Sequence, residues 1–129
     1  MRAWILFAVL VWQASAEQLD PVVDRLCHVR MFAFGGVGFV GLITQGQKDY
    51  DAILSRASAE SDFEKVFANG NRQAKAYALA ALRKLDPEKF KSLSMALRSS
   101  KDEAETGGGC ILMRRPLGEL VKGIEAGAY

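Results

Sequence analysis

Apolar residues recur every three or four positions over residues 71–85, which is the spacing of one buried helix face. The residues on that face are Ala74, Tyr77, Ala78, Ala81, Leu82 and Leu85. Asn71 is a good N-cap for this helix, and Asp86 followed by Pro87 is a typical start for the next one. The spacing therefore predicts two consecutive helices, over 71–85 and 86–98.

Further helix signals lie on either side of this pair. Asp20 followed by Pro21 predicts a first helix that carries Cys27. A short helix is expected over 48–56, another from Ser58 or Ser61 up to Gly70, and a last one from Pro116 to Gly127. A capping box formed by Ser61 and Glu64 is the expected start of the helix that ends at Gly70. Small compact bundles of five or six short helices fit these signals, so the expected fold class is all-α.

Residues 31–43 are apolar throughout and carry no charge. A run of 13 residues is too short to cross a bilayer as a helix. Its glycines recur every three positions, which would give a small-residue ridge on a helix or positive-φ turns in a loop. We expect a bent or broken buried helix that packs in the core, with docking on a membrane or an apolar ligand as the alternative. The candidate ligand or packing residues are Phe32, Phe34, Gly35, Gly38, Phe39 and Gly41.

Residues 99–109 are polar and then glycine-rich, which predicts a mobile surface loop. The short apolar run 110–113 follows and is expected to be a lone extended segment. The charged residues in and next to this loop are the candidates for contact with a partner: Asp102, Glu103, Glu105, Arg114 and Arg115.

Residues 1–16 have the pattern of a secretory signal peptide: a basic Arg2, a short apolar run and the small residues Ala14 and Ala16. Export to the periplasm or the extracellular space would bring Cys27 and Cys110 into an oxidising compartment. We expect one disulfide between them, which closes a loop of roughly 84 residues and contributes about 4.5 kcal/mol. Intermolecular pairing and a free reactive thiol are the alternatives. The remaining residues, 17–129, are expected to form a single helical domain.

Residues 76–90, AYALAALRKLDPEKF, form an Ala/Leu-rich helix that ends in Leu-Asp-Pro. On these residues, segment 58–98 resembles a HEAT-type helical repeat, which implies HEAT-like local packing; only one unit is visible, whereas solenoids need three or more. The whole chain also resembles small uncharacterised exported bacterial proteins that share a glycine-rich FGGVGF segment and a late Gly-Cys. This second resemblance implies no activity.

Composition and motifs exclude several classes of function. Loss of Arg2 with the leader would leave a net charge of +1, so neither nucleic acid nor an anionic membrane is indicated as a partner. Gly36, Gly38 and Gly41 match G-x-G-x-x-G, but the strand and helix context of a dinucleotide site is missing. His28 is the only histidine, which argues against a zinc site. Cys27 and His28 are neighbours on a helix and do not face each other, which argues against a catalytic cysteine–histidine pair. We therefore expect no catalytic residues, no metal and no cofactor.

The function that these observations favour is that of an exported, non-enzymatic binding or accessory protein. It would act on a protein partner through a helical surface and the 99–109 loop, in the manner of an immunity protein or an inhibitor. A carrier of a small apolar ligand or lipid, with a cavity lined by Phe32, Phe34, Val37 and Phe39, is the alternative. A hydrolase that uses clustered carboxylates is a third and weaker hypothesis. No transmembrane segment is expected in the mature chain.

Overall fold

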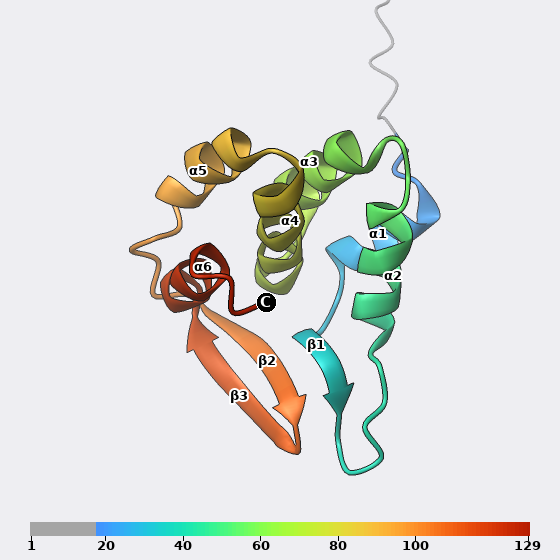
Figure 1. Cartoon of the computed structure of the whole chain (residues 1–129), viewed down its shortest axis with the longest axis vertical. Helices are drawn as coiled ribbons and strands as arrows, with labels where there is room; N and C mark the ends of the chain where they lie inside the picture. The colour runs from blue at the N-terminus through green and yellow to red at the C-terminus, as the bar shows by residue number, and fades with distance from the viewer. Residues whose placement is uncertain (1–17) are drawn as a thin grey trace, which may run out of the picture.

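The computed structural model describes residues 18–129, in which a three-stranded sheet stands beside six helices (Figure 1). The elements in chain order are α1 (Pro21–Cys27), β1 (Phe32–Val37), α2 (Gln45–Leu54), α3 (Ala59–Asn69), α4 (Arg72–Leu85), α5 (Pro87–Met95), β2 (Glu103–Gly109), β3 (Ile111–Pro116) and α6 (Leu117–Glu125). The fold is therefore α/β, and the expected all-α class is wrong. The expected signal peptide lies outside the described residues.

The sheet has the strand order β1-β2-β3. β1 and β2 are parallel, with Phe32 opposite Thr106, and a register irregularity follows Ala33. β2 and β3 form an antiparallel hairpin, in which Thr106 faces Met113. β3 is an edge strand, and residues 111–115 are all exposed.

Local cap chemistry explains where several helices begin. The Asp20 carboxylate accepts a hydrogen bond from the Val22 backbone N–H at 3.0 Å, and Asn71 and Asp86 cap α4 and α5 in the same way. These three predicted helix starts are confirmed. Of the two predicted starts of α3, Ser58 is confirmed as the N-cap position, whereas the capping box at Ser61 is wrong because Ser61 lies inside the helix.

Helix α4 lies at the centre of the core, and its residues from Ala76 to Leu82 are all buried. The Tyr77 hydroxyl donates to the Ala33 carbonyl at 2.7 Å and accepts from the Ala33 N–H at 3.0 Å. This pair of bonds ties β1 to α4. Around Tyr77 the rings of Phe32, Phe34 and Tyr50 pack edge-on or tilted at centroid distances of 4.9–5.7 Å.

Two segments that were expected to be helix and loop are strands. β1 occupies the first half of the apolar run 31–43, where four glycines at positions 35–41 oppose a helix. In β2 the exposed Glu103 and Glu105 alternate with the buried Ala104 and Thr106. This alternation is the period of a half-buried strand, but Ala104 and Thr106 are too small or too polar to give it an apolar signal.

The predicted disulfide is also wrong. Cys27 is buried at the end of α1, whereas Cys110 is exposed at the turn between β2 and β3, and both thiols are free. Figure 1 shows why: the hairpin turn lies at one end of the molecule, away from α1. The backbone around Cys27 is fixed against α4 instead, through a 3.0 Å bond from the Asn71 N–H to the Cys27 carbonyl.

Candidate functional site

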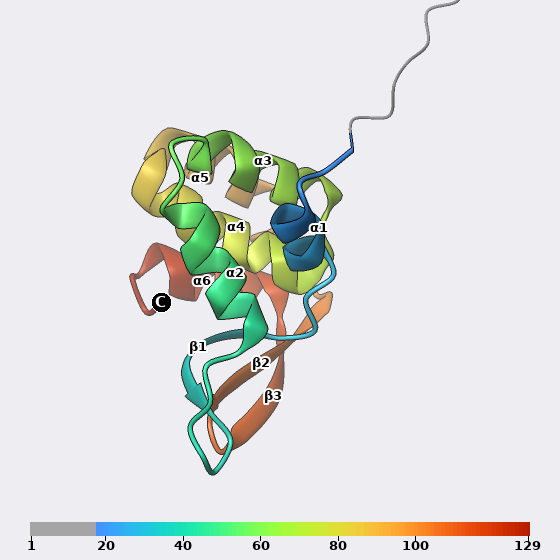
Figure 2. The same cartoon turned by 90° about the vertical axis from the view of Figure 1, so that its right-hand side faces the viewer.

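Six exposed apolar side chains lie on two backbone segments, the connection between β1 and α2 and the start of β3. Figure 2 shows both segments at one end of the molecule. We call this group of side chains the apolar tip; its members are Phe39, Val40, Leu42, Ile43, Ile111 and Leu112. Phe39 is 99% exposed and Leu112 is 67% exposed. Four members come from the connection between β1 and α2, and two come from β3 directly after the hairpin turn.

Glycines shape the first half of the apolar tip. Val37 and Leu42 exchange two backbone hydrogen bonds, of 2.9 and 3.0 Å, and close a loop over residues 38–41. Gly38 and Gly41 at the ends of this loop have φ values of +79° and +67°, in the left-handed region that other residues rarely adopt. The tight loop leaves Phe39 and Val40 at its outer end, where they are exposed.

The second half of the tip is joined to the first by backbone. Gly109 in the hairpin turn also has a positive φ, of +55°, and its carbonyl accepts a 2.7 Å hydrogen bond from the Gly38 N–H. The loop 38–41 and the hairpin turn therefore lie side by side, as both Figure 1 and Figure 2 show. The six apolar side chains belong to one continuous end of the fold.

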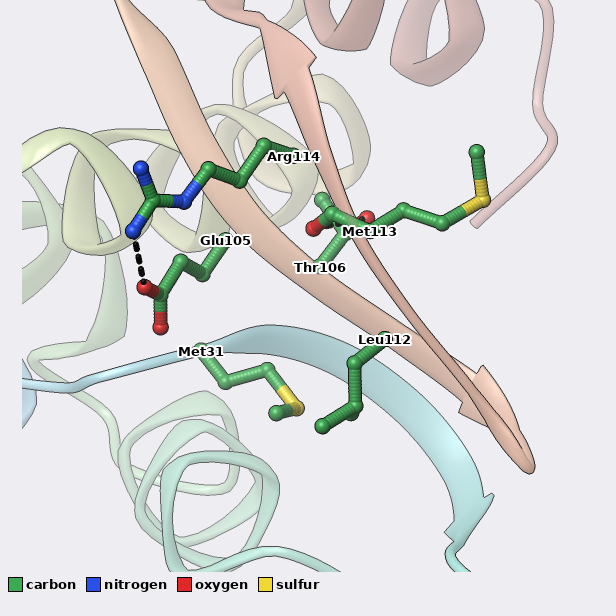
Figure 3. Close-up of a pocket in the computed structure, with 6 residues that line it drawn as sticks. All are labelled: Met31, Glu105, Thr106, Leu112, Met113 and Arg114. Atoms are coloured by element: carbon green, nitrogen blue, oxygen red, sulfur yellow. Dashed lines mark hydrogen bonds and ion pairs between the residues drawn. The ribbon is translucent and has the colours of Figure 1, made fainter.

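A groove of about 220 Å³ runs along the sheet behind the tip (Figure 3). Met31 and Leu112 approach each other over Gly107, whose missing side chain leaves room for the Met31 sulfur. A Cβ at Gly107 would come within 2.5 Å of that sulfur atom. The far end of the groove is polar, since Glu105 and Arg114 form a 3.4 Å ion pair there. The groove therefore extends the apolar surface of Leu112 towards a charged rim.

Charge is absent from the tip and positive around it. Residues 31–47 and 106–113 contain no Asp, Glu, Lys or Arg. Arg30 and Lys48 bound the first segment, and Arg114 and Arg115 follow the second. Within residues 18–129, Arg30, Lys48 and Arg115 are exposed and form no ion pair.

The structure separates the predicted ligand segment into two parts. Phe32 is buried and Phe34 is half-buried in the aromatic cluster around Tyr77, so both are core residues. Gly35 turns the chain with a φ of +81°, and its N–H donates to the Gln47 side chain at 2.8 Å. Of the predicted phenylalanines, only Phe39 belongs to the tip.

The charged residues expected on a mobile loop lie on or beside the sheet. Asp102 is 3.8 Å from Arg72, and the Glu103 carbonyl accepts a 3.2 Å bond from the same guanidinium. Glu105 pairs with Arg114 across the hairpin. Of the five charged residues predicted to contact a partner, Asp102, Glu105 and Arg114 are therefore in ion pairs within the fold. Arg115 is exposed and forms no ion pair within residues 18–129.

Two carboxylates that could do acid–base chemistry meet at the exposed Glu60, where a side-chain hydrogen bond to Asp86 raises the pKa of Glu60. The other candidate groups are held in separate places. Asp49 is buried, and both of its carboxylate oxygens accept from Arg25, at 2.6 and 2.7 Å. Burial raises the pKa of the Cys27 thiol, and the Asp24 charge adds to the effect, so Cys27 is a poor nucleophile. No group of three or more His, Cys, Asp or Glu residues within 18–129 is placed to hold a metal ion.

Sequence reasoning missed most of the tip, namely Val40, Leu42, Ile43, Ile111 and Leu112. The signal that was present is the absence of charge in both segments, combined with the glycines that bracket them. The run 31–43 is predicted to pack in the core, because most large apolar side chains are buried in folded proteins, and the run 110–113 is predicted only to be extended. No helix within the described residues is long and apolar enough to span a bilayer.

Comparison with protein-family models, with curated proteins and with solved structures found no match to this chain. The resemblance of segment 58–98 to a HEAT-type repeat therefore stays a prediction, although α3 packs on α4 and α4 packs on α5 in series.

Proposed function

We propose that this protein is a non-catalytic binding protein and that the apolar tip is its contact surface. The observation that carries the proposal is the exposure of six clustered apolar side chains in a chain whose other large apolar residues are mostly buried. Scattered exposed apolar residues are normal, but a clustered patch marks a site of interaction.

The geometry supports the apolar tip as the contact surface, in place of the 99–109 loop that was expected from the sequence. The 99–109 segment is mostly strand β2, and two of its three acidic residues, Asp102 and Glu105, are paired with Arg72 and Arg114. The loop 38–41 and the start of β3 take its place as the protruding element. Glycines at the ends of the loop and in the hairpin turn hold this element in a fixed shape, which lowers the entropy cost of binding.

A non-catalytic role is supported by how the carboxylates are used. Asp49 is held by Arg25, and Glu105 is held by Arg114. A catalytic acid or base is instead expected in a cleft, within reach of a substrate and with a perturbed pKa. Export is part of the proposal and rests on residues 1–16, which lie outside the described part of the chain. An immunity-like or inhibitor-like role would be one form of this binding function.

The carrier alternative has weaker support. Phe32 and Tyr129 line a pocket of about 250 Å³ beside the hairpin, but this pocket is open to solvent. A larger pocket of about 420 Å³ lies between α4, α5 and α6, but it too is open to solvent, and four of its six lining residues are charged: Arg83, Lys84, Lys91 and Glu125. Carrier sites are expected to be enclosed and mainly apolar, at about 300 Å³ or more.

The test compares three immobilised proteins: the wild type, the double variant F39S/L112S and the control M95S. Met95 is 69% exposed on α5, so M95S removes an exposed apolar side chain far from the tip. Each protein is exposed to envelope extract from the source cells, and the retained proteins and lipids are identified by mass spectrometry. We expect the wild type and M95S to retain a component that F39S/L112S loses at least tenfold. Equal retention by all three proteins would show that the apolar tip is not the contact surface.

A further inference from the structure

We propose that the apolar tip inserts into the surface of an anionic lipid bilayer, so that the protein is a peripheral membrane-binding protein. This inference rests on the proposed function and names the partner of the same surface. It requires no membrane-spanning element: the tip would enter only the interface, as the apolar face of an amphipathic helix does.

The shape of the tip fits a bilayer better than a folded protein partner. Its most exposed side chain, Phe39, belongs to the tight loop that the Val37–Leu42 hydrogen bonds close. The connection between β1 and α2 protrudes from the fold in Figure 2, so this surface is convex. Folded partners of a convex apolar loop must supply a matching pocket, whereas lipid chains adapt to any shape. The chain enters the described fold at residue 18, which lies at the end opposite the tip (Figure 2).

The distances along β3 place apolar and basic residues at different depths. Ile111 and Leu112 follow the turn residue Cys110 directly, within roughly 7 Å at about 3.3 Å per residue. Arg114 and Arg115 lie roughly 13 to 17 Å along the strand from the same turn. Interfacial apolar surfaces enter the boundary between headgroups and acyl chains by about 5–10 Å. Insertion to that depth would bury the tip and leave both arginines near the phosphate groups.

The charges around the tip favour an anionic surface. The first charged residues that flank the two uncharged segments are Arg30, Lys48, Glu105 and Arg114, with Arg115 next. The single acidic residue among them, Glu105, is paired with Arg114. The overall charge of the chain hides this local excess of positive charge, because acidic and basic residues nearly balance over its whole length. Each exposed basic residue near an anionic bilayer strengthens binding by about fivefold.

The same charges oppose the other simple occupant, a second copy of this chain. An unpaired edge strand such as β3 invites pairing with another strand. An antiparallel pair of two β3 strands would bring Arg114 and Arg115 of both copies close to the two-fold axis. Within β2 and β3 the acidic residues are Glu103 and Glu105, and Glu105 is already engaged with Arg114, so the four arginines of a pair would outnumber the free carboxylates. A lipid surface presents anions where a second copy would present more cations.

The experiment measures co-sedimentation of the protein, purified as the cell produces it, with vesicles of two compositions. One is phosphatidylcholine alone, and the other is equimolar phosphatidylcholine and phosphatidylglycerol. F39S/L112S removes two apolar side chains of the tip. R30Q/R115Q removes two of the exposed positive charges that flank its uncharged segments. Their matched controls are M95S and K84Q/K91Q, which change exposed residues of α4 and α5 away from the tip. Phe39 and Leu112 are exposed, so the tip variant keeps the fold, and circular dichroism verifies this for every variant.

We expect the wild type and both controls to bind the anionic vesicles and to release them at high salt. F39S/L112S should lose at least tenfold in binding to either vesicle, and R30Q/R115Q should lose at least tenfold on anionic vesicles only. A fluorophore on Cys110 should shift to the blue when anionic vesicles are added. If the tip variant binds vesicles as the wild type does, the inference is wrong.

Two further outcomes separate this inference from the proposed function. In the first, the wild type retains a protein from the envelope extract, F39S/L112S does not, and neither binds vesicles. The proposed function then stands and the lipid inference is wrong. If the wild type is a dimer by light scattering, F39S/L112S is a monomer and vesicles are not bound, the partner is a second copy and the lipid inference again falls.

Discussion

The backbone N–H of Gly38 donates a 2.7 Å hydrogen bond to the carbonyl oxygen of Gly109. These two glycines are 71 positions apart in the sequence, and both have positive φ values. Their hydrogen bond joins a loop after β1 to the turn between β2 and β3. A shape that depends on left-handed backbone at both partners is sensitive to any side chain there, which gives a direct test of the tip.

Replacement of Gly38 by alanine should destabilise the protein, because a Cβ opposes the φ value of +79° even though nothing lies within 4 Å of it. A left-handed conformation costs a residue with a side chain about 1–2 kcal/mol. Gly108 is the matched control: it also has open space around its Cβ position, but its φ is not positive. Urea unfolding should show a loss of about 1–2 kcal/mol for G38A and less than about 0.5 kcal/mol for G108A. Equal losses would contradict the strain argument.

The two cysteines should react at very different rates. Cys110 is exposed at the hairpin turn, whereas Cys27 is 2% exposed and burial raises its pKa. Mass spectrometry after iodoacetamide treatment should show one adduct, on Cys110, under native conditions and a second, on Cys27, only in denaturant. Because no bridge links the two residues, reductant and the C110S variant should leave the melting temperature unchanged. A lower melting temperature in reductant would instead indicate that a disulfide bond between Cys27 and Cys110 stabilises the protein.

The ion pair between Arg25 and Asp49 should be energetically asymmetric. The Asp49 side chain is 4% exposed, whereas that of Arg25 is 54% exposed. R25M leaves a buried carboxylate with Gln45 as its remaining side-chain donor, at 3.0 Å. D49N leaves a guanidinium that water can reach. Removal of the partner of a buried charge is the costly change, so R25M should lower the urea midpoint more than D49N.

The pair formed by Arg98 and Glu125 is a control for this asymmetry. Its two side chains are 43% and 45% exposed, and their closest atoms are 2.7 Å apart. R98M and E125Q should therefore have small and similar effects, because water can solvate whichever charge remains. If R25M and D49N also prove equal, the burial of Asp49 does not control the stability of its pair.

The helix starts were predictable because their chemistry is local. An Asp or Asn cap is satisfied by a backbone N–H two or three residues ahead, as at Asp20, Asn71 and Asp86. The sheet was not predictable in this way. β1 and β2 pair in parallel across more than 60 intervening residues, and their glycine-rich sequences carry little of the alternation that identifies a strand.

The tip was not predictable because a sequence does not separate an exposed apolar run from a buried one. Residues 32–34 and 39–43 belong to one uncharged segment, yet the first part packs around Tyr77 and the second faces solvent. The change occurs at Gly35 and Gly38, where positive φ values turn the chain away from the core. Core space is limited in a domain of this size, and the eight buried residues of α4 occupy its centre. Only the assembled fold shows which part is left outside.

Tyr50 and Tyr77 are both buried, but the roles of their hydroxyl groups differ. The Tyr50 hydroxyl has no hydrogen-bond partner within the described residues, whereas that of Tyr77 both donates to and accepts from the backbone of Ala33. Y77F leaves two buried backbone groups without a partner, which should cost about 1–3 kcal/mol. Y50F removes an unsatisfied group and should be neutral or stabilising near pH 7. Urea unfolding of the two variants measures the difference, and a larger loss in Y50F would contradict the assigned hydrogen bonds.

Y50F should also differ from the wild type in alkaline solution. Burial, with contributions from Asp51 and Tyr77, raises the pKa of Tyr50 from 10.0 to about 12. In the unfolded chain Tyr50 loses its proton near pH 10, so between about pH 10 and pH 12 the unfolded state binds fewer protons than the folded state, and stability falls as the pH rises. Y50F lacks this loss and should gain about 1 kcal/mol relative to the wild type at about pH 11 compared with about pH 8. If the difference between Y50F and the wild type is the same at both pH values, Tyr50 ionises in the folded protein as freely as in the unfolded chain.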